Sequence, residues 1–120
     1  MEITNLNRVE PFVTKDGSEI RELLSSRNSC IRNQSLAEAR VCPGSRTIPH
    51  VHPNTEEIYY ILDGTGEMQV DDEASPVGPG DAVAIPPGAP HTIRNTGEKT
   101  LAFLCCCAPE YTHEDTRLLG

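Results

Sequence analysis

Short apolar segments, each closed by a turn, are the feature that most restricts the fold of this chain. Clear examples are SLAEARV (35–41), EEIYYIL (56–62), DAVAIP (81–86) and TLAFLCCCA (100–108). Most of the ten prolines and nine glycines lie in the breaks between such segments, where these residues favour turns and interrupt strands. Short strands separated in this way are typical of an all-β sandwich or barrel. With 120 residues, the chain is about the size of one domain.

One segment near the N-terminus leaves two interpretations open. In SEIRELL (18–24) the apolar residues Ile20, Leu23 and Leu24 share one face of a helix, and Asp16 with Glu19 resembles a capping box. The segment is also short enough to be a strand.

Composition and charge exclude several classes of function. The formal net charge is −8, which disfavours binding to nucleic acid or to anionic membranes, because both attract basic surfaces. No apolar run approaches the roughly 18 to 20 residues of a membrane span, and the N-terminus lacks the features of a signal peptide. Five cysteines, three of them adjacent, make a poor disulfide framework. We therefore predict a cytoplasmic protein that binds neither nucleic acid nor membrane.

The four histidines carry the strongest chemical signal. His50 and His52 are two residues apart, so in a strand both point to the same side and can reach one ion. A carboxylate follows, either Glu56 or Glu57. Imidazoles and a carboxylate commonly bind Zn, Fe, Mn or Ni. Taken alone, the pair is a weak signal, because a strand that faces solvent accounts for the same spacing more often than a metal site does.

Two spaced motifs identify this region as similar to the cupin family. The first motif is a glycine, five residues, HxH, three or four residues, a glutamate, six residues and a glycine; its positions are filled by Gly44, His50, His52, Glu57 and Gly64. The second is a glycine, five residues, P-x-G, two residues, a histidine, three residues and an asparagine; its positions are filled by Gly80, Pro86, Gly88, His91 and Asn95. The fixed gap before Gly64 selects Glu57 over Glu56.

The resemblance implies a single-domain double-stranded β-helix, also called a jelly-roll or cupin barrel, over residues 35–110. It also implies one divalent transition metal (Fe, Mn, Ni, Zn or Cu), with the ligands His50, His52, Glu57 and His91. Residues 1–34 are expected to add strands or a short helix to an outer sheet or a dimer contact. Residues 111–120 are expected to form a polar tail on the outside, and His113 is expected to lie on the surface.

Strand alternation extends the prediction to the pocket. If Glu57 faces inward, so do Tyr59 and Ile61, while Ile58 and Tyr60 face outward. The full set of predicted lining residues is Arg46, Ile48, Tyr59, Ile61, Met68, Val70, Val83, Ile85, Ile93 and Phe103.

The catalytic residues themselves are not identified by the sequence. Tyr59 is a candidate acid/base or hydrogen-bond donor, or else a packed wall residue. Arg46 is a candidate clamp for a carboxylate or phosphate, or else part of a salt bridge at the rim. Cys105 and Cys107 share one strand face and Cys106 takes the other, but the sequence leaves open which face looks inward.

A metal-dependent enzyme for a small oxygen-containing molecule is the function this pattern favours, with either dioxygenase or isomerase/lyase chemistry. The alternative is a non-catalytic small-molecule binding or sensor protein. The resemblance further suggests a homodimer through an outer face that carries Val51, Ile58, Tyr60 and Leu62.

Overall fold

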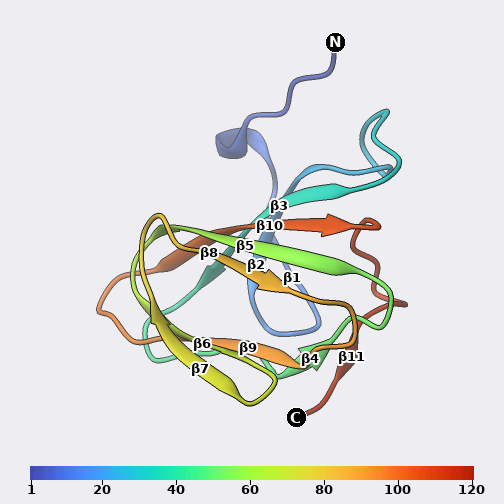
Figure 1. Cartoon of the computed structure of the whole chain (residues 1–120). Coiled ribbons are helices and arrows are strands. Elements are labelled where there is room, and N and C mark those ends of the chain that lie inside the picture. The colour runs from blue at the N-terminus through green and yellow to red at the C-terminus, as the bar shows by residue number, and fades with distance from the viewer.

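Two antiparallel sheets face each other and enclose the interior of the chain (Figure 1). The computed structural model describes all residues, 1–120. The larger sheet has the order β1 (Phe12–Val13), β2 (Glu19–Leu24), β3 (Ser35–Val41), β10 (Leu101–Ala108), β5 (Glu56–Asp63) and β8 (Ala82–Ile85). The smaller sheet has the order β11 (Arg117–Leu118), β4 (His50–Val51), β9 (His91–Asn95), β6 (Gly66–Val70) and β7 (Glu73–Val77). The predicted all-β jelly-roll barrel is confirmed.

The only helix is a single 3₁₀ turn, η1 (Leu6–Arg8), near the N-terminus. No helix in the structure has the length and apolar character needed to cross a membrane.

The central pair of strands, β5 and β10, fixes which side chains face inward. In β5, Glu57, Tyr59 and Ile61 are buried while Ile58 and Tyr60 are exposed, so the predicted alternation is confirmed. In β10, Cys105 is paired with Tyr59 and Cys107 with Glu57. This register turns both thiols into the barrel and leaves Cys106 exposed, which resolves the alternative that the sequence left open.

Apolar side chains fill one end of the barrel. Ile61, Ile93, Leu101 and Phe103 are at most 1% exposed, and Met68 and Ile85 pack in the same cluster. Burying each such side chain contributes roughly 1.5–3 kcal/mol. The inward residues at the opposite ends of β5, β9 and β10 are Glu57, His91 and Cys107, so the barrel has an apolar end and a polar end.

The motif glycine Gly64 allows two segments to approach closely. Its φ is +83°, and a Cβ atom there would lie 2.8 Å from the carbonyl oxygen of Thr100. Any larger residue would therefore be strained and would also clash with the chain that leads into β10.

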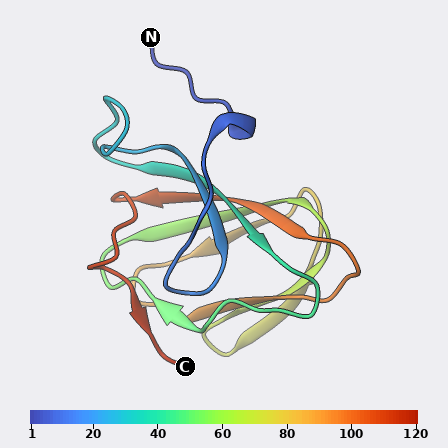
Figure 2. The ribbon, with the colours of Figure 1, turned by 180° about the vertical axis from the view of Figure 1, so that it is seen from behind.

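The segment SEIRELL forms strand β2 and not a helix. Asp16 does not cap a helix: its Oδ1 accepts hydrogen bonds from the Ser18 amide (2.9 Å) and hydroxyl (2.6 Å), which stabilises a turn at Gly17. The chain then pairs with β3. Residues 1–34 are consequently more than an outer addition, because the β1–β2 hairpin crosses the barrel (Figure 2) and its turn lies over the polar end, where Asp16 contacts His50.

The C-terminal residues 111–120 do not simply lie outside, which corrects the prediction for the tail. Strand β11 pairs with β4, with Arg117 opposite Val51 and Leu118 opposite His50. Thr116 is buried and Tyr111 is half-buried. A two-residue strand is too short to leave a periodic pattern, which explains the error. His113 is exposed, as predicted.

Candidate metal centre

Three histidines meet at the polar end of the barrel because two strands of the smaller sheet bring them together. His50 in β4 lies directly opposite His91 in β9, and His52 follows β4. The ligand nitrogens of the three side chains lie within 4.8 Å of one another, and all three residues are buried. The spacing of the two sequence motifs therefore reflects a real convergence in space.

Backbone carbonyl groups fix the orientation of each ring. The Nδ1 atoms contact the carbonyl oxygens of Ile48 (2.7 Å, from His50), Ala89 (3.0 Å, from His91) and Asp115 (3.3 Å, from His52). A carbonyl oxygen only accepts hydrogen bonds, so each Nδ1 carries the proton. Each Nε2 then presents its lone pair, which is the form in which imidazole binds a metal ion.

Glu57 completes the group from β5. Its Oε1 lies 3.3 Å from Nε2 of His52 and 3.5 Å from Nε2 of His91. Glu57 Oε1 and His91 Nε2 are both buried without a hydrogen-bond partner. A carboxylate oxygen that faces nitrogen lone pairs in a buried site requires a cation between them. These four side chains therefore fit a divalent metal ion.

In the metal-free protein a proton can take the place of the metal ion between Glu57 and the histidine nitrogens. Burial raises the pKa of Glu57, but the close contacts with His52 and His91 outweigh this effect and lower it to about 2. Burial lowers the pKa of His52, but its contact with the Glu57 carboxylate outweighs this effect and raises it. A proton and a metal ion thus compete for the same pair of side chains.

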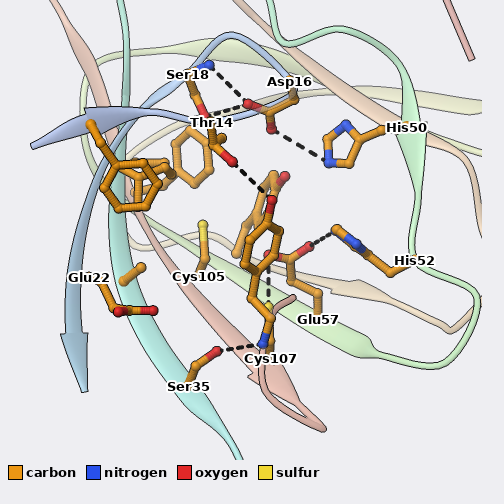
Figure 3. Close-up of a pocket in the computed structure, with 17 residues that line it drawn as sticks. Thr14, Asp16, Ser18, Glu22, Ser35, His50, His52, Glu57, Cys105 and Cys107 are labelled. Carbon is orange, nitrogen blue, oxygen red and sulfur yellow. Dashed lines mark hydrogen bonds and ion pairs between the residues drawn. The ribbon is translucent and has the colours of Figure 1, made fainter. Parts of the chain in front are cut away.

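A small, partly open cavity adjoins the histidines (Figure 3). Its volume is about 50 Å³. Of the predicted lining residues, Tyr59 and Phe103 border it, whereas Ile61, Met68, Ile85 and Ile93 pack in the apolar core. Val70 and Val83 pack at the edge of that core and border a separate, open hollow beside β7. The space at the site is therefore smaller than alternation alone indicates.

Arg46 and Ile48 do not line the cavity, which corrects their predicted orientation. Arg46 is exposed, Ile48 is half-buried, and Thr47 between them is buried. The extrapolation from His50 fails because Pro49 interrupts the strand and so breaks the period of two. Ile48 supports the site differently, through the carbonyl group that accepts from His50.

Tyr59 packs against the ring of Phe103, with a centroid distance of 4.5 Å, and its ring lies 5.9 Å from that of His91. Burial raises its pKa well above the ordinary value. Its hydroxyl group is therefore a hydrogen-bond donor at neutral pH and not a base.

Of the other cavity residues, the sequence left the direction of Cys107 open and gave no signal for Tyr111, Thr14 or Asp16 as neighbours of the histidines. Cys107 donates from its thiol to Glu57 Oε2 over 3.2 Å, and burial raises the pKa of this thiol, so it keeps the proton. Tyr111 from the tail and Thr14 from the hairpin are joined by a 2.9 Å hydrogen bond beside the cavity. Asp16 places its Oδ2 3.5 Å from His50 Nε2. No motif spacing links these residues to the histidines.

Fold and site together define a small jelly-roll barrel with an inward group of three histidines and one carboxylate. The chain belongs to the cupin family: the family model described as Cupin domain matches residues 37–107, more than half of the chain.

The relatives include a protein of Methanocaldococcus jannaschii, MJ1618, described as uncharacterized; it is 50% identical over 116 residues and covers 97% of this chain and 93% of its own. An oxalate-binding protein of Thermotoga maritima is 35% identical over 86 residues, which are 72% of this chain and 71% of that protein. Among solved structures, a predicted oxalate decarboxylase from Thermotoga maritima superposes with a TM-score of 0.80 at 28% identity and covers 90% of this chain and 99% of that one.

Proposed function

We propose that this cupin is a metal-dependent enzyme that acts on a small oxygen-containing molecule. The ligands are His50, His52, Glu57 and His91, and the ion is one divalent transition metal. The observation that carries the proposal is the pair of buried atoms without a partner, Glu57 Oε1 and His91 Nε2, inside a group whose rings are oriented by backbone carbonyls.

The formal charge of the bound ion and its open coordination positions determine which reactions the site could support. Three neutral imidazoles and one carboxylate leave a divalent ion with a formal charge of about +1 and roughly two open positions in octahedral geometry. A bound ion would polarise a carbonyl group or stabilise an enediolate, which suits isomerase, lyase or dioxygenase chemistry. The protein supplies the Tyr59 hydroxyl as a donor and the Phe103 ring as a dry wall. Oxalate, named for the Thermotoga relative, is one molecule whose binding to this site should be measured.

Elemental analysis of the purified protein tests the metal site. We expect about one divalent ion per chain in the native protein and in a His113→Ala control, since His113 is exposed. The His50→Ala/His91→Ala double variant should retain none. A native protein that binds no divalent ion after reconstitution would contradict the proposal.

Turnover assays then separate the alternatives. Oxygen uptake with a panel of small hydroxyketones, catechols and keto-acids supports a dioxygenase, whereas conversion without uptake supports an isomerase or lyase. A protein that binds these molecules at the metal without converting any of them is a binding or sensor cupin.

We also propose a homodimer through the outer face of β5. Ile58, Tyr60 and Leu62 are 48%, 43% and 41% exposed there, and exposed apolar groups of this kind mark contact surfaces. Val51 does not belong to this face, because β4 lies in the other sheet. A dimeric mass by light scattering at micromolar concentration is expected, and a monomer would contradict the proposal.

A further inference from the structure

The turn between β1 and β2 brings a second carboxylate to the histidines. Hydrogen bonds hold both the side chain and the backbone of Asp16. Its Oδ1 accepts from the amide and the hydroxyl group of Ser18, and its backbone oxygen accepts from the Ile48 amide over 2.7 Å. Ile48 is the residue whose carbonyl group orients His50. The position of Asp16 is therefore fixed relative to the metal ligand itself.

Only one oxygen of Asp16 is used by the turn. Its Oδ1 makes both bonds to Ser18, while Oδ2 points to Nε2 of His50 at 3.5 Å (Figure 3). Glu57 contacts the other two histidines. The three imidazoles thus lie between two carboxylates, and the stability of the turn does not require the second oxygen of Asp16.

The charges around the cavity are one-sided. Its acidic residues are Asp16, Glu22 and Glu57, and no lysine or arginine lines it. Glu22 is ion-paired with Arg27. A divalent ion with Asp16 and Glu57 has a formal charge of zero, so a bound dianion would bring the site to −2 in a buried setting without a compensating cation.

We propose that Asp16 determines the ligand specificity of this centre: it selects a small neutral molecule that bears a hydroxyl group and disfavours dicarboxylates. The hydroxyl group of the ligand donates a hydrogen bond to Asp16 Oδ2, while the charge of Asp16 repels a second carboxylate. The cavity of about 50 Å³ favours a small ligand. This inference rests on the proposed metal site and narrows its substrate class.

The test uses protein reconstituted with Co²⁺, whose visible spectrum reports ligand binding directly. Three two-carbon probes of similar size serve as ligands: glycolamide is neutral with a hydroxyl group, glycolate is a monoanion with a hydroxyl group, and oxalate is a dianion without one. We compare the native protein with Asp16→Asn, which keeps the Oδ1 acceptor of the turn. Glu56→Gln is the control, since it makes the same charge change on an exposed residue outside the barrel.

In the native protein we expect glycolamide to bind more tightly than oxalate. Asp16→Asn should tighten oxalate binding by about tenfold or more, weaken glycolamide binding and leave the Co²⁺ content unchanged, with glycolate between the two. Glu56→Gln should leave the order of affinities as in the native protein.

Three results would overturn the inference in different ways. An unchanged ratio of oxalate to glycolamide affinity in Asp16→Asn removes the selective role. Loss of Co²⁺ from Asp16→Asn shows that Asp16 is a metal ligand and not a selector. A native protein that does not hold Co²⁺ overturns the metal site as well, so failure of the inference and failure of the proposed function are distinguishable.

Discussion

The two ends of the barrel interior are built from the same strands but differ in what they contribute. In β5, Glu57 lies at the polar end and Ile61 at the apolar end; in β10, Cys107 and Leu101 have the same relation. The apolar end is closed by side chains that exclude water almost completely. The polar end holds a small cavity and two buried polar atoms without partners. Stability and chemistry are therefore separated along each strand.

This separation has an energetic basis. A buried polar atom without a partner costs about 1–3 kcal/mol, so the two atoms of this kind at the polar end lower the stability of the metal-free fold. Burial of the apolar end offsets it. An ion that binds the folded chain but not the unfolded chain raises the free energy of unfolding. The increase is about 4 kcal/mol when the free ion concentration is a thousand times the dissociation constant.

The largest effect on stability is expected at the apolar end. Ile61→Ala should lower the free energy of unfolding by about 2–5 kcal/mol, because Ile61 is fully buried. Val13→Ala, at an exposed residue of β1 outside the proposed dimer face, should cost much less. Urea unfolding of the metal-free proteins measures both. Metal affinity under folded conditions should be unchanged in the two variants; a large loss in Ile61→Ala would show that the two ends are not separate.

At the polar end, the two adjacent glutamates give the sharpest contrast in metal affinity. Glu57→Gln should weaken binding by more than the roughly 10- to 100-fold that loss of a ligand's hydrogen-bond partner costs, because it removes the charge of the proposed carboxylate ligand. Glu56→Gln changes an exposed side chain and should have little effect. Titration with Zn²⁺ against a competing chelator measures both affinities, and the reverse order would assign Glu56 as the ligand.

Prediction from the sequence succeeded where a local pattern determines the geometry. The motif spacing places His50, His52 and His91 together, and the alternation of β5 gives the inward face from Glu57 to Ile61, because a strand repeats every two residues. It failed at Arg46, where Pro49 breaks the strand. Neighbours that come from other parts of the chain, Asp16 and Tyr111, depend on how the hairpin and the tail close over the barrel. No periodicity records such contacts.

The pH dependence of stability should also differ between the two ends of the barrel, because the His52–Glu57 pair titrates at the polar end. Glu57 raises the pKa of His52 above its ordinary value of 6.5, so in the metal-free protein this pair stabilises the fold below that value. The contribution is lost as pH rises through the raised pKa. Metal affinity should change in the opposite direction, rising over the same interval as the proton leaves.

Unfolding and Zn²⁺ titrations across this interval test the prediction. The pH dependence of stability should flatten in His52→Ala and persist in His113→Ala, since His113 does not contact Glu57. A metal-free protein whose stability rises with pH through this interval would have the wrong sign for a proton shared between His52 and Glu57.

The smallest effect concerns the three adjacent cysteines, where neighbouring residues face opposite sides of β10. Cys107 donates to Glu57 Oε2, which leaves Oε1 directed at His52 and His91. Cys107→Ala should weaken metal binding by about tenfold, and Cys107→Ser, which keeps a donor, should recover part of the loss. Cys106→Ala alters an exposed thiol and should leave affinity unchanged. Equal affinities in Cys107→Ala and the native protein would show that the strands alone hold Glu57 in place, and that the thiol only fills space beside it.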